Sequence, residues 1–397
     1  MLIGVVGKTN VGKSTFFKAA TLANVLIGNY PFATIKPNHG IGFVKIDCVD
    51  KEFNVQCNPR KGFCIEHKRF VPVELLDVAG LVPGAHEGKG LGNQFLNDLN
   101  QADVLIHVID ASGSTNERGE TVEAGSYNPV SDIEFLEIEL DYWYMDIIKK
   151  GWEKFAKKVQ QEHANIVEAL TKQLSGLKVT EEMIKKSLEK LRLTAKNPET
   201  WDEKELFNLA RELRIKSKPI IIAANKIDIA NAEKNLEELK NKFTDYTIIG
   251  CSAEAELALK EADHENLIKY IPGENDFEYI KKENMNEKQI KGLNFIKENV
   301  LKKYSSTGVQ DTINRAVFDV LKYKIIFSGG IHNLEDKDGN ILPDCFLLPK
   351  DATALDFAYA IHTNIGDKFV KAIDGRTGKA LGKEHVLKHR DVIRIVN

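Results

Sequence analysis

The N-terminal strand, loop and helix constrain the fold more than any other part of the chain. Leu2–Val6 is a short apolar run rich in branched side chains, as in a buried parallel strand. Residues 7–14 then read GKTNVGKS, which fits G-x-x-x-x-G-K-[ST] without deviation, and residues 15–23 read as a helix. Such a unit points backbone amides at a bound anion. We therefore predict a phosphate-binding loop on a parallel α/β sheet.

The polar side chains of this loop predict how a nucleotide is held. Lys13 places a positive charge beside the β- and γ-phosphates, and the Ser14 hydroxyl can ligate Mg²⁺. We expect the loop and the residue after it to contact the nucleotide: Gly7, Lys8, Thr9, Asn10, Val11, Gly12, Lys13, Ser14 and Thr15.

A second motif, D-V-A-G at residues 77–80, directly follows an apolar run that ends at Leu76. Asp77 would hold Mg²⁺ through water, and the Gly80 amide would sense the γ-phosphate. D-x-x-G is common by itself. Its position at the end of a strand, downstream of a phosphate loop, makes it a strong signal for a nucleotide site that contains Mg²⁺.

The third motif, N-K-I-D at residues 225–228, follows the apolar run 220–224 and indicates which base is bound. A carboxylate can accept hydrogen bonds from both N1–H and the exocyclic amine of guanine, and adenine lacks that donor pair. Asp228 would therefore select guanine, while Asn225 and Lys226 brace and cover the base. After the next strand come Ser252, Ala253 and Glu254, and we expect the Ala253 amide to meet the guanine O6.

The spacing of the strands predicts an inserted helical segment. Roughly a hundred residues separate the strand ending at Asp110 from the one beginning at Pro219, whereas such connections usually take a few residues around one helix. Apolar residues recur there at helical spacing. We predict a coiled-coil-like αα-hairpin over 130–215, with 175–178 at its tip. Its lysine pairs at 157–158 and 185–186 could touch phosphates, and the alternative is a solvated helix face.

The remaining chain divides into parts with different patterns of strand-like and helical runs. We assign residues 1–129 and 216–275 to the nucleotide-binding domain and 276–322 to a helical connector. From 323 to 397, short strand-like runs at 324–327, 345–348, 369–373 and 391–396 surround one helix at 354–362. This arrangement predicts a separate small α+β domain.

Composition limits the compartment and the partners. The net charge of -3 gives no whole-chain case for nucleic-acid binding, so an RNA contact would need a local basic patch. No apolar run is long enough to span a membrane, and no signal peptide is expected. The chain has five cysteines, an odd and sparse set that argues for a reducing compartment. We expect a cytoplasmic protein, with a monomer as the default.

Three of the cysteines lie close together in the sequence. Cys57, Cys64 and His67, with Cys48 nearby, could form a Cys₃His zinc site. The spacing C-x₆-C-x₂-H is not a standard finger pattern, however. The alternative, which we favour at this stage, is a β-hairpin whose thiols are packed or free.

Two further stretches carry a family resemblance. Residues 29–38, NYPFATIKPN, are similar to the N-Y-P-F-T-T-I-x-P-N switch I of the Obg-like group of TRAFAC GTPases. The stretch from 348–353, LPKDAT, to 391–393, DVI, looks like a TGS domain, a ubiquitin-like β-grasp module. With the phosphate loop and the insertion, the chain resembles the YchF/Ola1-type branch in its archaeal form. The resemblance implies a P-loop sheet, a helical insertion and a C-terminal TGS domain.

Two departures from the family pattern bear on the activity. Ala33 replaces the first threonine of switch I, and Thr34 remains as the candidate Mg²⁺ ligand and γ-phosphate sensor. ATP-preferring members of the branch carry Glu in place of the last Asp of N-K-x-D, whereas this chain has Asp228. The resemblance alone would suggest ATP, but the carboxylate geometry indicates GTP.

Hydrolysis is expected to be slow. Leu81 occupies the position after D-x-x-G where related enzymes carry the glutamine that orients the attacking water. Our candidates for catalysis are Lys13, Thr34 and Gly80, with His86 as a candidate for approaching the γ-phosphate. In related GTPases an Asn at the position of Asn10 helps to hold an activating K⁺ ion.

Three functions remain open. The first is a Mg²⁺-dependent GTPase switch that binds a ribosome or RNA partner through its TGS domain and insertion. The second is an ATP-hydrolysing relative with a stress or redox role. The third is a scaffold that binds nucleotide without hydrolysing it, which the apolar Leu81 keeps open.

Overall fold

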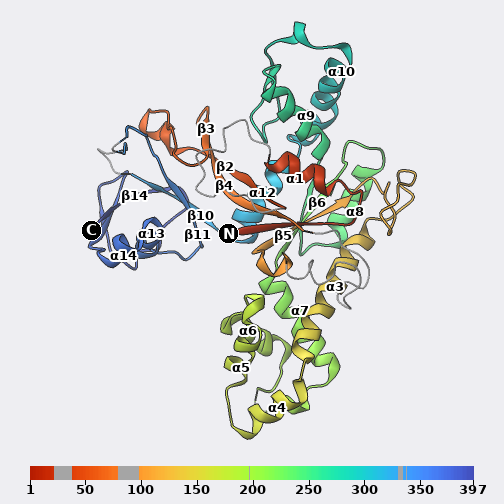
Figure 1. Cartoon of the computed structure of the whole chain (residues 1–397), viewed down its shortest axis with the longest axis vertical. Coiled ribbons are helices and arrows are strands. Elements are labelled where there is room, and N and C mark those ends of the chain that lie inside the picture. Colours follow the sequence, from red (N-terminus) through yellow and green to blue (C-terminus); the bar gives the residue numbers. More distant parts are fainter. Residues whose placement is uncertain (22–37, 79–97, 196, 330–333, 337) are drawn as a thin grey trace. The chain divides into compact units, whose positions relative to one another are not determined.

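The computed structural model describes residues 1–21, 38–78, 98–195, 197–329, 334–336 and 338–397 (Figure 1). The chain divides into two compact units. The first comprises Met1–Phe17 and Leu75–Ala253, and the second comprises Lys18–Glu74 and Glu254–Asn397. Each unit is built from two distant stretches of sequence, and we describe each by itself.

The first unit contains a parallel sheet. Its strands β1 (Leu2–Val6), β5 (Val104–Asp110), β6 (Ile220–Asn225) and β7 (Thr247–Gly250) are neighbours in that order. Every residue of β5 and β6 is buried, as expected for parallel strands covered on both faces. The predicted P-loop sheet is confirmed.

One further strand and two helices accompany these strands. The strand β4 (Lys68–Asp77) contributes its last residues to this unit, and the Val78 amide donates to the Val5 carbonyl at 3.0 Å. The helix α1 (Lys13–Thr21) follows β1 after the loop, and α8 (Ala232–Lys242) connects β6 to β7. The carboxyl ends of the parallel strands therefore meet at one edge, where ligands bind in sheets of this kind.

Over its described residues, the insertion between β5 and β6 contains five α-helices. They are α3 (Val130–Lys149), α4 (Trp152–Gln161), α5 (Ile166–Gln173), α6 (Glu181–Leu191) and α7 (Glu203–Ser217). Side-chain caps begin the later ones: Thr180 caps α6, and Asp202 forms a capping box with Glu205 at α7. The helical content agrees with the prediction, but the arrangement is not a single hairpin.

The predicted position of the tip was wrong. Lys178 forms an ion pair with Asp103, and its Nζ donates to the Gln101 carbonyl at 2.8 Å, directly before β5. Residues 175–178 therefore lie near the base of the insertion, and α4 is at its far end (Figure 1). Helical periodicity could not reveal this return, because a tertiary ion pair folds the α5–α6 turn back towards the sheet.

One hydrophobic core unites the sheet and the insertion. The same cluster of buried residues includes Ile222 from the sheet, Leu140 from α3 and Leu170 from α5. Trp152 at the start of α4 stacks on Trp201, with ring centroids 5.4 Å apart. Because apolar burial is the main favourable term in folding, the insertion depends on the sheet for much of its stability.

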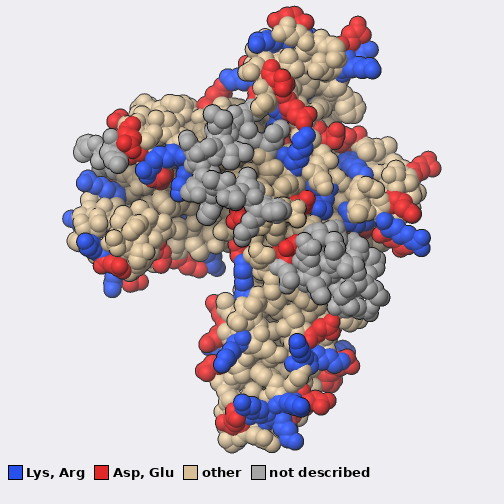
Figure 2. All heavy atoms as spheres, viewed as in Figure 1, with Lys and Arg blue, Asp and Glu red and all other residues tan. Residues whose placement is uncertain are grey.

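Charges of both signs cover the outer face of the insertion. Figure 2 shows blue and red atoms interspersed over the helices at its lower end. On α6, Lys185 and Lys186 pair with Glu181 and Glu182, each one turn away. These ion pairs favour a solvated helix face over phosphate contact for Lys185 and Lys186.

The second unit begins with β2 (His39–Asp47), the 3-10 helix η2 (Val49–Phe53) and the antiparallel hairpin of β3 (Phe63–Ile65) with β4. Its helical part contains α9 (Ala253–His264), α10 (Glu287–Ile296), α11 (Lys302–Tyr304) and α12 (Val309–Arg315). The π-helical segments η6 (Lys297–Leu301) and η7 (Ala316–Val320) extend α10 and α12, and β8 (Ile268–Lys269) pairs with β9 (Glu278–Tyr279).

The C-terminal part of this unit is a five-stranded sheet with the order β11-β10-β14-β12-β13. Its strands are β10 (Lys324–Ser328), β11 (Cys345–Leu348), β12 (Lys371–Asp374), β13 (Ala380–Leu381) and β14 (Asp391–Val396). The first and last strands run parallel at the centre, and α13 (Ala354–Ile361) packs Phe357 into the core. This β-grasp arrangement confirms the predicted α+β fold. The sequence did not indicate the short α14 (Thr363–Asp367) or β13.

None of the helices in the described ranges combines the length and the apolar character that crossing a membrane requires.

The ion pair between α3 and α7 gives a test of the insertion. Asp141 Oδ1 accepts from Arg214 Nε at 2.8 Å, and both side chains are almost fully buried. We expect Asp141→Asn to lower the free energy of unfolding by about 3 kcal/mol, because the buried guanidinium loses its main counter-charge. Chemical denaturation measures this value.

The matched control is Asp146→Asn, at an exposed position on the same helix, which should change stability by less than about 0.5 kcal/mol. Equal effects of the two substitutions would show that the buried pair does not hold the helices together.

Candidate nucleotide-binding site

Two glycines give the loop between β1 and α1 its shape. A Cβ on Gly7 would lie 2.5 Å from the Val108 carbonyl oxygen, so any side chain would collide with β5. Gly12 has φ +90°, and a Cβ there would lie 2.2 Å from Asn225 Nδ2. Both glycines therefore allow backbone to approach closely, which a phosphate cradle requires.

Asn225 connects the three segments that the motifs predicted. Its side chain is 3% exposed at the end of β6. Nδ2 donates to the Val11 carbonyl at 2.9 Å, and Oδ1 accepts from the Ala253 amide at 2.9 Å. One side-chain amide thus fixes the phosphate loop and the segment after β7 to the same strand end. Asn225 therefore braces two protein segments, and its predicted contact with the base stays a prediction.

The two segments that we expect to contact guanine lie next to each other, but the amide of Ala253 is used in another hydrogen bond. The Ile227 amide donates to the Cys251 carbonyl at 3.1 Å, which holds the 225–228 turn against the 252–254 segment. Asp228 is partly exposed, and no described residue donates a hydrogen bond to its carboxylate. The Ala253 amide donates to Asn225 Oδ1, and its predicted contact with guanine O6 stays a prediction.

The two neighbours of Ala253 differ in accessibility. Ser252 is buried beside the end of β7, whereas Glu254, the second residue of α9, is exposed. Burial of Ser252 fits a role in shaping the turn. Exposure of Glu254 leaves its carboxylate in solvent.

Lys226 is held by a residue that sequence reasoning missed. Its Nζ donates to Asp110 Oδ2 at 2.8 Å, and Asp110 also accepts from Ser112 and Thr115. Burial alone would raise the pKa of Asp110, but these hydrogen bonds outweigh it and hold the pKa below its ordinary value. The signal was available, because Asp110 ends β5 as Asp77 ends β4.

Two of the residues predicted to serve phosphate and Mg²⁺ in the first unit are in contact. Lys13, the first residue of α1, forms an ion pair with Asp77, the last residue of β4. Ser14 follows at an exposed position in the first turn of the helix, with Thr15 next to it. A hydroxyl, a carboxylate and an ammonium group at one helix N-terminus suit a Mg²⁺–phosphate complex. Thr34, Gly80, Leu81 and His86 lie outside the described residues.

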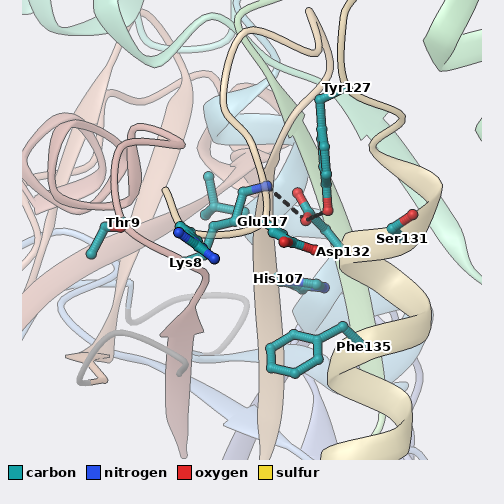
Figure 3. Close-up of a pocket in the computed structure, with 10 residues that line it drawn as sticks. Lys8, Thr9, His107, Glu117, Tyr127, Ser131, Asp132 and Phe135 are labelled. Carbon is teal, nitrogen blue, oxygen red and sulfur yellow. Dashed lines mark hydrogen bonds and ion pairs between the residues drawn. The ribbon is translucent and has the colours of Figure 1, made fainter. Parts of the chain in front are cut away.

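The Lys8 side chain points from the phosphate loop towards the start of α3. Its Nζ donates to Asp132 Oδ1 at 2.8 Å and to the Thr115 carbonyl at 3.0 Å, and it lies 3.9 Å from the centre of the Tyr127 ring. Figure 3 shows this lysine reaching Asp132 at the start of α3. Only the main chain of Lys8 is therefore placed to serve a phosphate.

A cavity of about 550 Å³ adjoins this ion pair. Its walls include Thr9, His107 and Phe135, but neither Asp228 nor Ser252, so it is separate from the predicted base site (Figure 3). His107 is buried in β5, and burial together with the nearby Lys8 lowers its pKa to about 3. It is therefore a neutral core histidine, as we expected from its position in the strand.

Asn10 binds a neighbouring loop. It has φ +62°, and its Nδ2 donates to the Gly119 carbonyl at 2.7 Å. A Cβ on Gly119 would lie 1.8 Å from Thr9 Oγ1, so this second loop packs tightly on the phosphate loop. The amide nitrogen of Asn10 is thus committed, which leaves Oδ1 as the atom that suits a cation.

Comparison with known protein families is consistent with this geometry. A model described as 50S ribosome-binding GTPase matches residues 2–133. One described as the G4 motif-containing domain of the YGR210-like Obg-like GTPases matches 223–329, and one for the TGS domain matches 333–397.

Relatives match over the whole chain or about two thirds of it. The GTP-binding protein MJ1332 of Methanocaldococcus jannaschii is 50% identical over 100% of this chain and 99% of its own length. The ribosome-binding ATPase YchF of Bacillus subtilis is 33% identical over 66% of this chain and 69% of its length. A crystal structure of a GTP-binding protein from Pyrococcus horikoshii matches with a TM-score of 0.79 at 37% identity, covering 100% of this chain and 99% of that one. The chain therefore belongs to the YchF/Obg-like family of P-loop GTPases and ends in a TGS domain.

Proposed function

We propose that this protein is a Mg²⁺-dependent GTPase that acts as a conformational switch. The observation that carries the proposal is the pair of hydrogen bonds made by Asn225, which hold the phosphate loop and the base-recognition segments at one strand end. A nucleotide that bridges these segments would contact Lys13 with its phosphates and Asp228 with its base. Both residues have the chemistry that Mg²⁺-GTP requires.

The choice of GTP over ATP rests on Asp228. Its carboxylate has no competing donor among the described residues, so it is available to N1–H and the exocyclic amine of guanine. The Bacillus subtilis relative YchF is named an ATPase, which makes ATP hydrolysis the second candidate. Competition between GTP and ATP for the purified protein separates the two, since an adenine base offers Asp228 no matching pair of donors.

The proposed switch follows from Mg²⁺ and the γ-phosphate. Ser14, Thr34 and Asp77 would hold the ion, and the Gly80 amide would sense the γ-phosphate. Hydrolysis would release the contacts of Thr34 and Gly80, as in other nucleotide switches. Turnover would be slow because Leu81 cannot orient water, with His86 or a K⁺ ion at Asn10 as candidates for the missing group.

The proposed partner is a ribosome or another RNA assembly in the cytoplasm. The matched family model and the Bacillus subtilis relative both carry ribosome binding in their names. The TGS domain and the helical insertion are the parts outside the nucleotide site and would read the switch. A single-turnover GTP hydrolysis assay with Mg²⁺, with and without ribosomes, tests both parts of the proposal. Absence of hydrolysis in every condition would favour a nucleotide-stabilised scaffold.

Base selection is testable by exchanging one group. We expect Asp228→Asn to weaken GDP binding about a hundredfold, because the amide carries no charge and its NH2 group cannot accept the hydrogen bond of the guanine exocyclic amine. The same variant should gain affinity for xanthosine diphosphate, since an amide can accept from N1–H and donate to the carbonyl at position 2 of xanthine. Fluorescent-nucleotide titration measures both. The control is Asp245→Asn, at an exposed position in the same unit. Unchanged selectivity in the Asp228 variant would contradict the proposed base contact.

Because Asn225 is uncharged, replacing it should lower the affinity for GTP without changing the charge of the site. Asn225→Ala removes both hydrogen bonds and should weaken GTP binding about thirtyfold, at about 1 kcal/mol for each bond. Asn241→Ala, at an exposed position on α8, is the matched control. Calorimetric titration gives both affinities, and equal values would mean that the brace does not shape the site.

The K⁺ hypothesis predicts a dependence on the monovalent salt. GTP hydrolysis in KCl should exceed that in NaCl by at least about tenfold, which corresponds to about 1.4 kcal/mol of transition-state stabilisation. Asn10→Ala should remove the difference. Equal rates in the two salts would exclude K⁺ activation and leave the proposed GTPase activity intact.

A further inference from the structure

Three cysteines and one aspartate form a compact cluster in the second unit, which we call the thiol–carboxylate cluster. It consists of Cys48, Asp50, Cys57 and Cys64, and one ligand atom from each lies within 4.8 Å of all the others. Cys48 follows β2, Asp50 belongs to η2, and Cys64 is the middle residue of β3. None of these residues is part of the proposed nucleotide site.

The distances in the cluster suit a bound metal better than a disulfide. The sulfur atoms of Cys48 and Cys57 are 3.4 Å apart, and Cys64 Sγ lies 3.7 Å from Asp50 Oδ2. A disulfide would bring two sulfurs to about 2.05 Å. A tetrahedral zinc ion with Zn–S bonds of about 2.3 Å separates its sulfur ligands by about 3.8 Å. Both distances are close to that separation, so the ligand atoms lie near the corners of a tetrahedron that a zinc ion could occupy.

Burial makes the carboxylate costly unless it is compensated. Asp50 is 0% exposed, and Cys48 and Cys57 are also buried. The Oδ2 atom of Asp50 accepts from the Cys57 amide at 2.9 Å, which directs it into the cluster. Buried carboxylates are found paired with cations or bound to metals, because desolvating an isolated charge is unfavourable.

The surroundings of the cluster carry positive charge and orienting hydrogen bonds. Arg69 is fully buried, and its Nη1 donates to Cys57 Sγ at 3.4 Å and to the Leu342 carbonyl at 3.1 Å. His67 Nδ1 lies 3.0 Å from Asp50 Oδ1, the carboxylate oxygen opposite the one in the cluster. Outer groups of this kind orient metal ligands and balance the charge of thiolates.

We propose that Cys48, Asp50, Cys57 and Cys64 bind one Zn²⁺ ion in a closed, four-coordinate structural site. Three thiolates and a carboxylate in tetrahedral reach match the donor set that zinc prefers. The sequence suggested His67 as the fourth ligand, but the structure puts Asp50 in the cluster and His67 behind it, as a positioning residue. This arrangement favours the metal site over a hairpin with free thiols.

The ion would tie the end of β2 to the β3–β4 hairpin. It would also fix Cys57 beside Arg69, whose contact with Leu342 connects this hairpin to the start of the C-terminal domain. Metal binding of this type contributes directly to folding stability. The inference does not depend on nucleotide hydrolysis, so its failure and the failure of the proposed GTPase are distinguishable.

The experiment measures metal on the full chain. Protein purified without chelators and dialysed against metal-free buffer should contain about one zinc per chain by mass spectrometry. Replacement of zinc by Co²⁺ should give the thiolate-to-cobalt charge-transfer absorption. Both signals should be lost in Cys57→Ser and retained in Cys345→Ser, a control at a thiol outside the cluster.

Two further variants identify the fourth ligand. Asp50→Ala should abolish stable zinc binding, whereas His67→Ala should keep about one zinc with an affinity about 10- to 100-fold lower. The reverse result would assign the ligand to His67 and overturn the proposed donor set. Because a cysteine variant can fail to fold, the wild-type cobalt spectrum and zinc content stand as independent readouts.

Three outcomes would overturn the site altogether. They are less than about 0.1 zinc per chain together with no cobalt charge-transfer band, zinc content unaffected by Cys57→Ser, and a Cys48–Cys57 disulfide in protein alkylated at lysis.

Discussion

The nucleotide site depends on a single side-chain amide. Asn225 gives one hydrogen bond to the phosphate loop and accepts one from the segment after β7. Gly12 is required because a Cβ there would occupy the position of Asn225 Nδ2. The phosphate loop, the N-K-I-D turn and the segment 252–254 therefore form one structural unit, because the buried Asn225 side chain holds them together at the end of β6.

Around this brace, lysine–carboxylate pairs organise the carboxyl edge of the sheet. Lys13 contacts Asp77, Lys226 contacts Asp110, and Lys8 contacts Asp132. The first pair combines groups that suit phosphate and Mg²⁺. The other two fix the loop after β5 and the start of α3, so they support the phosphate loop from outside. Their burial makes each partner dependent on the other.

Much of the architecture was predictable because it depends on local patterns. Apolar runs predicted the parallel strands, and the short strands around one helix predicted a small α+β domain, which only the resemblance to a TGS domain specified as a β-grasp. The tip of the insertion was predicted wrongly, because helical periodicity says nothing about the ion pair of Lys178 with Asp103. The sequence also did not indicate that the Ala253 amide donates to Asn225 Oδ1, because this contact depends on how β6 and β7 pair. The predicted contact of this amide with guanine O6 stays a prediction.

By itself, the sequence determined the phosphate loop, the position of the carboxylate that we propose selects guanine, and the two kinds of domain, because these depend on short motifs and regular periods. Only the tertiary structure decided which side chains share a site. It brought Asp110 to Lys226, turned Lys8 towards Asp132, and placed Asp50 rather than His67 among the three thiols. The reason is that side-chain direction and the distance between ligand atoms are set by packing between elements, which residue spacing does not encode.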